Sequence, residues 1–311
     1  MSLIAAKFRY KAKRFLRLSK LRWRLYIFIL PAFLYFAIFR YGPLYGVQLA
    51  FKDYNYGLGI WNSPWVGLKY FLRFFDSYYF NVVIKNTLLI NLYQILLFPL
   101  PVIFALSLNE LGNRRYKKLV QTVAYIPHFI PAVIIVGMIL IFLDPNNGMV
   151  NMFIQALGGA PSRFMGEPKY FYGIYIFSGE WQHLGWSSII YIAALSGVNT
   201  ELYDAAHMDG ANRFQRVIYI NIPAILPTVL TLFILRMGSA MSIGFEKIYL
   251  MQNNLNMSHS EVIQTYVYKV GLLQSQISFS VAIGLFNNMV ELILLLITNI
   301  LSKKVFEVNL F

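Results

Sequence analysis

The sequence predicts an all-α integral membrane protein with six transmembrane helices and both termini in the cytoplasm. Of its 311 residues, 58% are hydrophobic and 13% are charged, and its mean hydropathy is +0.55. Soluble domains average roughly a half apolar and a quarter charged residues. Six stretches of about 20 apolar residues, the length that crosses a bilayer, follow one another along the chain. Cations gather at the ends of these stretches, which favours anionic membrane lipid over nucleic acid as their partner.

The chain begins with a basic segment, residues 1–24, which has nine Lys or Arg residues and no acid. Aromatic and aliphatic residues alternate with these cations, so we expect an amphipathic helix on the cytoplasmic surface. A signal peptide would have a short apolar core and a cleavage site of small residues. Here the apolar run from Leu25 continues past Pro31 and resumes after Arg40, which predicts an uncleaved first span.

Five further spans are expected, at 86–108, 119–143, 171–195, 225–250 and 279–301. Several contain proline, which membrane helices tolerate where neighbours satisfy the freed carbonyl groups. There is no internal repeat and no soluble domain longer than a loop. The expected organisation is therefore one membrane domain over residues 25–301, followed by a cytoplasmic tail at 302–311.

The distribution of cations predicts the orientation. The N-terminal segment, the tail and the loops 109–118 and 200–223 together have 17 Lys or Arg residues, whereas the longer loops on the opposite side have seven. Because cytoplasmic loops are enriched in cations, both termini and loop 200–223 are placed in the cytoplasm.

A polar interlude separates the fourth and fifth spans, with the sequence TELYDAAHMDGANRFQRVIYINIP. It predicts a short helix capped by Thr200, a sharp turn at Gly210 and a second short helix that Pro223 separates from the next span. A helix with a thin, alanine-lined side on such a loop suits insertion into a groove on another protein.

This interlude resembles a loop of one transporter family in the spacing of its residues. Its pattern D-A-A-x-x-x-G-x(9)-I-x-I-P is similar to the E-A-A-x-x-x-G-x(9)-I-x-L-P loop, the EAA motif, of permease subunits in binding-protein-dependent bacterial ABC importers. Asp204 replaces the usual Glu and Ile222 the usual Leu. The resemblance implies that the loop docks into the ATPase subunit and couples it to the membrane helices, through Asp204, Ala205, Ala206, Asp209, Gly210, Ile220 and Pro223.

Further stretches resemble the branch of these permeases that imports oligosaccharides and polysaccharide fragments, including the alginate and lipo-oligosaccharide permeases. They include YGPLYGVQLAF, SPWVGL, YIPHF, GWSSIIY, FEKIY and TYVYKVG, spread over nearly the whole chain. The resemblance implies a type I permease fold in the bacterial inner membrane and one half of a translocation pathway working by alternating access. It also implies a second homologous permease, two ABC ATPase subunits that bind ATP and magnesium, and an extracytoplasmic sugar-binding protein.

No motif of catalysis is found in the chain itself. It has no cysteine, no HExxH and no Gly-rich phosphate loop, and its four histidines show no ligand pair at helical spacing. We therefore expect no enzyme activity, no cofactor and no metal in this subunit.

Polar and aromatic residues within the spans are candidates for the pathway, because ionisable groups there usually face a cavity or a partner. The candidates are Trp181, His183, Trp186, Tyr191, Arg236, Met241, Gly244, Glu246, Asn287, Asn288 and Glu291. Structural alternatives remain open for many of them. Arg236 and Glu291 are expected near the midplane and could form a buried pair, the aromatic residues could be packing or interfacial, and the asparagines could join helices.

Two other functions remain open. One is an ABC importer permease for a non-sugar solute, and the other is a self-sufficient secondary transporter, although the sequence lacks the repeats and interrupted helices typical of the latter.

Overall fold

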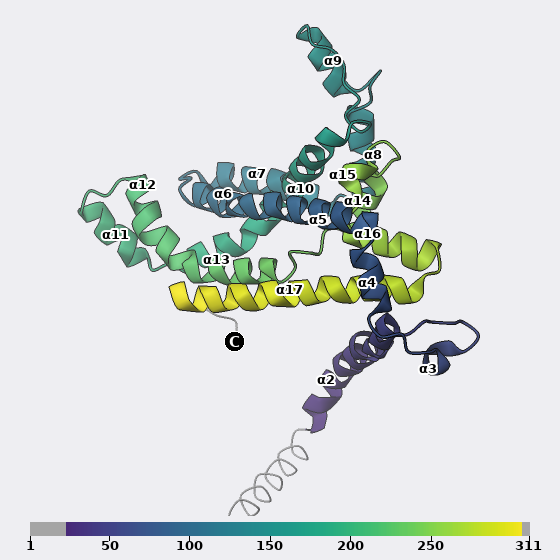
Figure 1. Cartoon of the computed structure of the whole chain (residues 1–311). Coiled ribbons are helices and arrows are strands. Elements are labelled where there is room, and N and C mark those ends of the chain that lie inside the picture. The colour runs from purple at the N-terminus through teal and green to yellow at the C-terminus, as the bar shows by residue number, and fades with distance from the viewer. Residues whose placement is uncertain (1–22, 307–311) are drawn as a thin grey trace, which may run out of the picture. The chain divides into compact units, whose positions relative to one another are not determined.

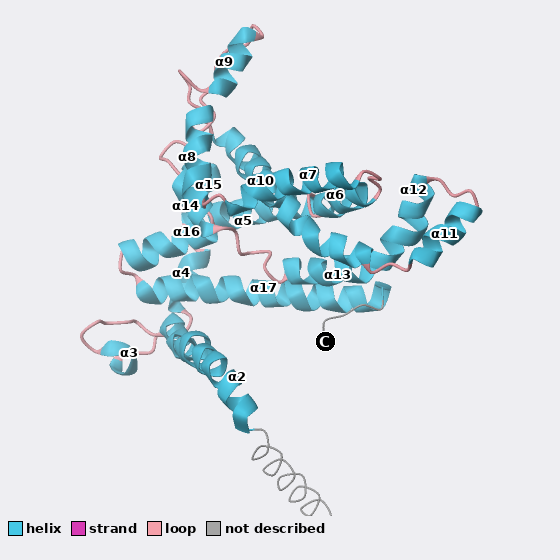
Figure 2. Cartoon of the chain, turned by 180° about the vertical axis from the view of Figure 1, so that it is seen from behind, coloured by secondary structure: helices cyan, strands magenta, loops and turns pink. Residues whose placement is uncertain are grey.

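The computed structural model describes residues 23–306, and these residues form helices joined by loops (Figure 2). Their one β-type contact is an isolated bridge between Lys52 and Trp65. The described chain divides into two compact units, one ending at Gly67 and the other beginning at Leu68. The expected basic amphipathic segment lies outside the described residues, apart from its last two.

The first unit contains one long helix and a loop. Helix α2 (Trp23–Phe36) continues through a π-turn (Ala37–Tyr41) and a 3-10 segment (Gly42–Phe51), and no side chain of α2 is buried. Exposed aliphatic and aromatic side chains on such a helix suit a lipid environment. The following loop, which contains α3 (Gly59–Asn62), is fixed by Lys52, whose Nζ donates to the carbonyl oxygens of Ile60 (2.8 Å) and Trp61 (3.1 Å).

The second unit is built of longer helices and short connecting turns (Figure 1). Its α-helices are α4 (Lys69–Phe75), α5 (Tyr78–Leu96), α6 (Pro99–Asn109), α7 (Arg114–Tyr125), α8 (Ala132–Phe142), α9 (Met149–Ala156), α10 (Pro168–Ser196), α11 (Thr200–Met208), α12 (Arg213–Arg216), α13 (Ile222–Met237), α14 (Phe245–Met251), α15 (Met257–Ser260), α16 (Ile263–Tyr268) and α17 (Ile277–Phe306). A 3-10 turn at Ile126–Phe129 and π-turns at Val217–Asn221 and Lys269–Leu273 join some of them.

Four continuous helical stretches among the described residues are long and apolar enough to cross a membrane: Trp23–Phe51, Tyr78–Asn109, Arg213–Met237 and Ile277–Lys304. A fifth is formed if α7 and α8 count as one span, although they are bent by 98°. The span expected at 119–143 therefore corresponds to this bent pair of helices. Pro127 and Pro131 explain the bend, because each lacks the N–H that a continuous helix needs.

Helix α10 covers the expected fourth span and is 29 residues long. It is not among the apolar helices, because its middle has the sequence SGEWQHLGWSS. It is also the central helix of the second unit, since α5, α6, α7, α13 and α15 all pack against it (Figure 1). A polar centre on such a helix indicates a site inside the bundle rather than a lipid-facing surface.

The fifth span ends earlier than expected. Helix α13 stops at Met237, residues 238–241 form a turn, residues 242–244 are irregular, and the separate helix α14 begins at Phe245. Gly238 and Gly244 flank this interruption, and glycine lowers the cost of leaving the helical conformation. The break places the side chains of α14 on the same cavity as those of α10, as described below.

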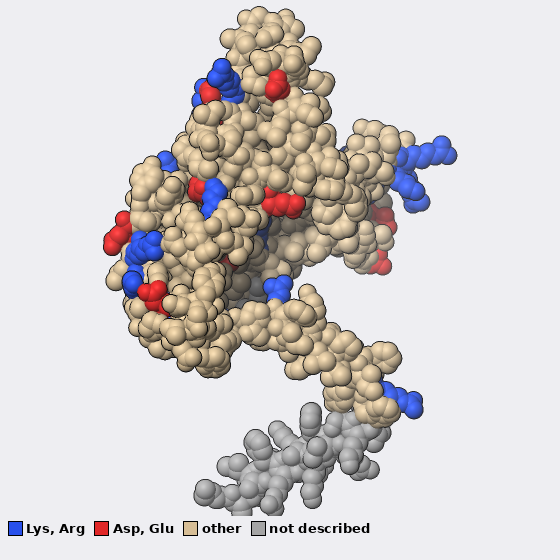
Figure 3. All heavy atoms as spheres, turned by 90° about the vertical axis from the view of Figure 1, so that its right-hand side faces the viewer, with Lys and Arg blue, Asp and Glu red and all other residues tan. Residues whose placement is uncertain are grey.

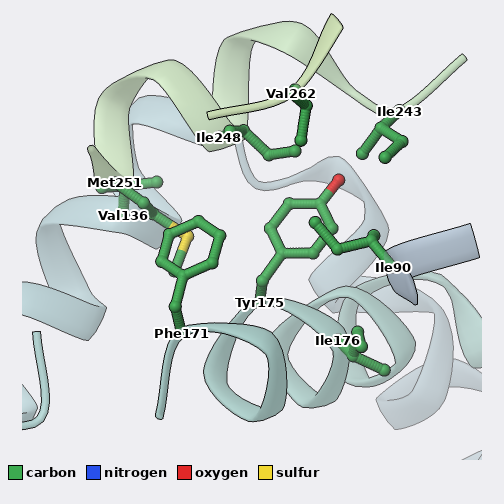
Figure 4. Close-up of a cluster of buried hydrophobic side chains, with 9 residues drawn as sticks. All are labelled: Ile90, Val136, Phe171, Tyr175, Ile176, Ile243, Ile248, Met251 and Val262. Atoms are coloured by element: carbon green, nitrogen blue, oxygen red, sulfur yellow. The ribbon is translucent and has the colours of Figure 1, made fainter. Parts of the chain in front are cut away.

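The core beside this cavity is a cluster of buried apolar side chains around Tyr175 and Phe171 of α10. Figure 4 shows the Tyr175 ring among Ile90, Ile243, Ile248 and neighbouring residues, which come from α5, α14 and the adjoining loops. This packing fixes α10 against α5 and α14.

Charged residues are sparse on the surface. On the face drawn in Figure 3, most atoms belong to uncharged residues, and Lys, Arg, Asp and Glu stand in separate small groups. Many large apolar side chains are exposed in the second unit as well, for example Leu292 and Leu296 of α17. Both features suit a protein whose helices are covered by lipid or by other subunits.

Candidate functional site

The loop at 200–223 is an ordered helix-turn-helix. Helix α11 begins after Asn199, whose Oδ1 accepts from the Glu201 backbone N–H at 3.0 Å, so the cap is Asn199 rather than the expected Thr200. The expected turn at Gly210 is confirmed, because its φ is +72°, a conformation that glycine adopts without strain. The prediction missed the cap by one residue because both side chains can accept this bond.

The second half of the loop does not separate from the span as expected. Helix α12, capped by Asn212 and Gln215, continues through the π-turn at Val217–Asn221 into α13, giving one helix from Arg213 to Met237. Pro223 lies inside this continuous helix, directly after the π-turn, and the wider π-turn accommodates its ring.

Four polar side chains fasten this loop to the end of α6. The Tyr203 hydroxyl donates to Asn221 Oδ1 (2.5 Å), and Asn221 Nδ2 donates to Glu110 Oε1 (3.3 Å). Arg216 Nη2 pairs with Glu110 Oε2 at 3.3 Å. Burial raises the pKa of the Tyr203 phenol above its ordinary value. The sequence analysis missed this network, since Glu110 lies about a hundred residues from its partners.

The opposite side of the loop is exposed. Asp204, Ala205, Asp209, Gly210 and Pro223 are exposed, and Ala206 and Ile220 are half-buried. Three large apolar side chains beside them, Met208, Phe214 and Tyr219, are 87%, 73% and 75% exposed. A helix pair fixed on one side and apolar on the other is able to dock into a partner protein.

The second candidate site is a cavity of about 980 Å³ in the second unit, bounded by α5, α6, α10, α13 and α14. Six of the expected pathway residues line it: His183, Trp186, Tyr191, Arg236, Gly244 and Glu246. Glu180, Gln182 and Lys247 line it as well, together with Gln94, which sequence analysis did not single out.

The other five expected pathway residues do not line this cavity. Trp181 faces a smaller apolar groove of about 370 Å³ beside α7. Met241 is buried, and its carbonyl oxygen accepts from Gln264 Nε2 at 2.5 Å. Asn287, Asn288 and Glu291 lie on α17 outside the lining, so their role in a pathway stays a prediction.

Arg236 is held by the amide of Gln94. Its Nη2 donates to Gln94 Oε1, whereas Glu291 accepts from Asn287 Nδ2 at 3.4 Å. The Arg236–Glu291 pair that the sequence left open as an alternative is therefore not formed. The reason is the position of Arg236, one residue before the end of α13, where it faces α5 and the cavity.

A pair of histidines connects the bend between α7 and α8 to α10. His128 Nδ1 and His183 Nδ1 are 3.1 Å apart, so one of the two rings donates to the other. The His128 ring also stacks on Trp186, with centroids 4.3 Å apart and planes within 5°. Gln182 Nε2 donates to the Ile130 carbonyl oxygen at 3.0 Å, a second connection at the same bend. The His128 ring thus covers one face of Trp186, Phe129 contacts the indole at a steep angle with centroids 5.7 Å apart, and Trp186 also lines the cavity.

Among the described residues, no group of three His, Asp or Glu side chains is placed to hold a metal ion. The cavity instead offers hydroxyl, amide and charged groups beside aromatic rings. Such a lining suits a polar, uncharged or charged organic molecule with many hydrogen-bonding groups.

Known proteins are similar to this chain over almost its full length. Protein LplB of Bacillus subtilis (strain 168) is 41% identical over 94% of this chain and 92% of its own. The polygalacturonan/rhamnogalacturonan transport system permease protein YteP of the same organism is 42% identical over 92% of this chain and 90% of its own.

The solved structures agree with these relatives. Crystal structures of a bacterial ABC transporter that imports the acidic polysaccharide alginate match with a TM-score of 0.88 and 37% identity, over 94% of this chain and 99% of that one. A second structure of the alginate transporter, in complex with its pentasaccharide-bound periplasmic protein, matches with the same TM-score and 36% identity, over 94% and 99% of the two chains.

The model of one family matches residues 98–307, more than half of the chain, and these residues include α6, α10, the loop at 200–223 and most of the cavity lining. The chain therefore belongs to the family of inner membrane components of binding-protein-dependent transport systems, and it has the fold of ABC importer permeases.

Proposed function

We propose that this chain is the membrane-spanning subunit of an ATP-driven importer and forms half of the pathway for oligosaccharides or polysaccharide fragments delivered by a binding protein. The observation that carries this proposal is the polar, aromatic-lined cavity of about 980 Å³ inside the helix bundle. Its volume is at the upper end of the range for small-molecule sites, too large for an ion and suitable for linked sugar rings. YteP is named for polygalacturonan and rhamnogalacturonan transport, and the solved transporter imports alginate, which favours a sugar cargo over a non-sugar solute.

The proposed topology has six spans with both termini in the cytoplasm. It counts the bent pair α7–α8 as one span and adds α10, whose polar residues face the cavity rather than lipid. The bias of Lys and Arg toward one side supports the orientation. Residues 200–223 then lie in the cytoplasm, with Met208, Phe214 and Tyr219 available to an ATPase subunit.

The chain works with partners in this proposal. A second homologous permease completes the pathway, two ABC ATPase subunits bind ATP and magnesium and perform the hydrolysis, and an extracytoplasmic protein supplies the sugar. Membership of the family removes the alternative of a self-sufficient secondary transporter, since its members act with a binding protein. The exposed apolar faces of α2 and α17 provide surface for lipid and for the second permease.

The proposal is tested by purifying the chain from membranes in mild detergent and identifying the proteins that accompany it. We expect a second permease and an ATPase, whose ATP hydrolysis rises when an oligosaccharide-loaded binding protein is added. A chain that purifies alone and transports sugar in liposomes without ATP would contradict the proposal.

A further inference from the structure

One charged group on the cavity wall has no hydrogen-bond partner. The Lys247 side chain is 9% exposed, and its Nζ is buried without a hydrogen bond to any described residue. It lies 5.4 Å from the centre of the Tyr175 ring, and a Cβ added at Gly179 would be 3.7 Å from it. The Tyr175 ring gives this ammonium a long cation–π contact but no hydrogen-bond acceptor. Burying an ammonium whose N–H groups have no acceptor is costly, so an arrangement of this kind indicates that an acceptor arrives during function.

The charges nearest to this amine are on the same cavity. Glu180 of α10 interacts electrostatically with both Arg236 and Lys247. Among the described residues, however, neither cation forms an ion pair with Glu180 within 4.0 Å. Glu246 lines the cavity next to Lys247, so the two cations and the two acids of the lining balance. The charged residues of the lining therefore add up to no net charge, and a negatively charged ligand would compete with Glu180 for the two cations.

We propose that Lys247 receives a carboxylate of an acidic oligosaccharide in this cavity, with Glu180 as the competing carboxylate when the cavity is empty. This inference rests on the proposed function and names the class of cargo. The flexible lysine side chain can turn its amine toward the cavity centre, where it would gain a charge-assisted hydrogen bond. Arg236, fixed by Gln94 on another wall, would hold the same or a neighbouring sugar unit.

A neutral sugar is a poorer partner for the buried Lys247 ammonium than an acidic one. A hydroxyl group can accept a hydrogen bond from the amine, but it does not neutralise a buried charge. The aromatic face of Trp186 that His128 leaves free can take the sugar ring of either kind of cargo. We therefore assign the choice between acidic and neutral sugars to Lys247 and Glu180, and the binding of the ring to Trp186.

The test uses the complete importer in proteoliposomes with its binding protein and ATP. Two test sugars of the same length, trigalacturonate and its methyl ester, are each supplied at saturating concentration, and the ratio of their uptake rates is measured. We expect Lys247→Met to lower the acid-to-ester ratio about tenfold, the scale of one charged contact, and Lys247→Arg to preserve most of it. Glu180→Gln removes the competing carboxylate, so it should raise the ratio.

Binding without the binding protein gives a second measurement. The thermal shift of the detergent-solubilised complex with trigalacturonate should be lost in Lys247→Met and enlarged in Glu180→Gln, while the shift with the ester stays unchanged. If the complex with Lys247→Met does not assemble, Lys247→Arg and Glu180→Gln still test whether these two residues select the acidic sugar. Size-exclusion chromatography shows which variants assemble.

The outcomes separate this inference from the proposed function. An importer that hydrolyses ATP with its partners, but whose ratio is the same in Lys247→Met and Glu180→Gln, contradicts the role of Lys247 alone. Wild-type importer that takes up the ester and not the acid, or neither sugar, contradicts it as well. A chain that has no ATPase partner at all contradicts the proposed function.

Discussion

Glu110 is the residue on which the attachment of the loop at 200–223 depends most. It accepts from Arg216 and Asn221 at 3.3 Å each, and the Glu110 and Arg216 side chains are 19% and 24% exposed. Breaking a fully buried pair costs about 3–5 kcal/mol, and breaking an exposed pair costs about 0–1 kcal/mol. For this mostly buried pair we expect Glu110→Gln to weaken the attachment of the loop by about 2 kcal/mol. That corresponds to roughly a 30-fold increase in the equilibrium constant for opening of the loop.

Hydrogen exchange of the backbone amides in residues 200–221 measures this opening directly. Exchange should accelerate about 30-fold in Glu110→Gln, while exchange in α10 stays unchanged. The matched control is Glu201→Gln, because Glu201 is exposed and its carboxylate contacts only the Asn199 amide among the described residues. Equal exchange in the two variants would refute the attachment described here. Transport should fall with ATP hydrolysis retained, as expected for weakened coupling.

Three further substitutions test other parts of the structure. Gly210→Val should abolish sugar uptake but not membrane insertion, because φ of +72° costs a side chain about 1–2 kcal/mol or more, and normal uptake would contradict the role of the turn. Gly185→Ala places a Cβ 2.2 Å from a carbonyl oxygen of α7 and should lower the melting temperature of the purified complex, whereas Gly173→Ala, with open space around it, should not. Asn86→Leu removes donors to two carbonyl oxygens, at 2.8 and 3.1 Å, and should cost about 2–4 kcal/mol of stability. Asn81→Leu on the exposed side of α5 is its control, and equal melting temperatures would count against the buried network.

The sequence predicted the helical class and the approximate spans because apolar length is a local property. The predicted span boundaries and shapes were less accurate where a span contains polar residues or proline. Helix α10 occurs at the expected position although its centre is polar, since the other helices of the second unit pack around it. The 98° bend at Pro131 and the end of α13 at Met237 depend on which neighbours satisfy the freed backbone groups, and the sequence does not show these neighbours.

The candidate sites were also predictable to different degrees, because some of their contacts are local in the sequence and others join distant segments. The turn at Gly210 follows from spacing within one short segment, and the structure confirms it. His183, Trp186 and Tyr191 lie on one helix and line one cavity, whereas Trp181 of the same helix faces another groove, so a shared helix did not decide which side chains meet. Gln94 was missed, and a pair between Arg236 and Glu291 stayed open as an alternative, because side chains on different spans meet only after packing. A local pattern can show that a charge lies within a span, but it cannot show which of several equally polar neighbours it faces.

The loop at 200–223 and the cavity are connected by two helical segments, Arg213–Met237 and α5–α6, which contact each other near both sites. On the continuous helix Arg213–Met237, Arg216 contacts Glu110 and Arg236 contacts Gln94, and both partners belong to the α5–α6 segment or its end. At 1.5 Å per residue, the contacts are about 30 Å apart along one helix and about 24 Å along the other. A shift of the loop against α6 must therefore either bend α13 or move Arg236 relative to Gln94 in the cavity. The helix between the two contacts contains the π-turn at Val217–Asn221 and Pro227, where helices can bend. It is nevertheless continuous from Arg213 to Met237 and has no glycine, so we expect part of the movement to reach the cavity. On this basis Glu110→Gln should also weaken the dependence of sugar uptake on Arg236, so that Arg236→Ala reduces uptake less in the Glu110→Gln background than in the wild type.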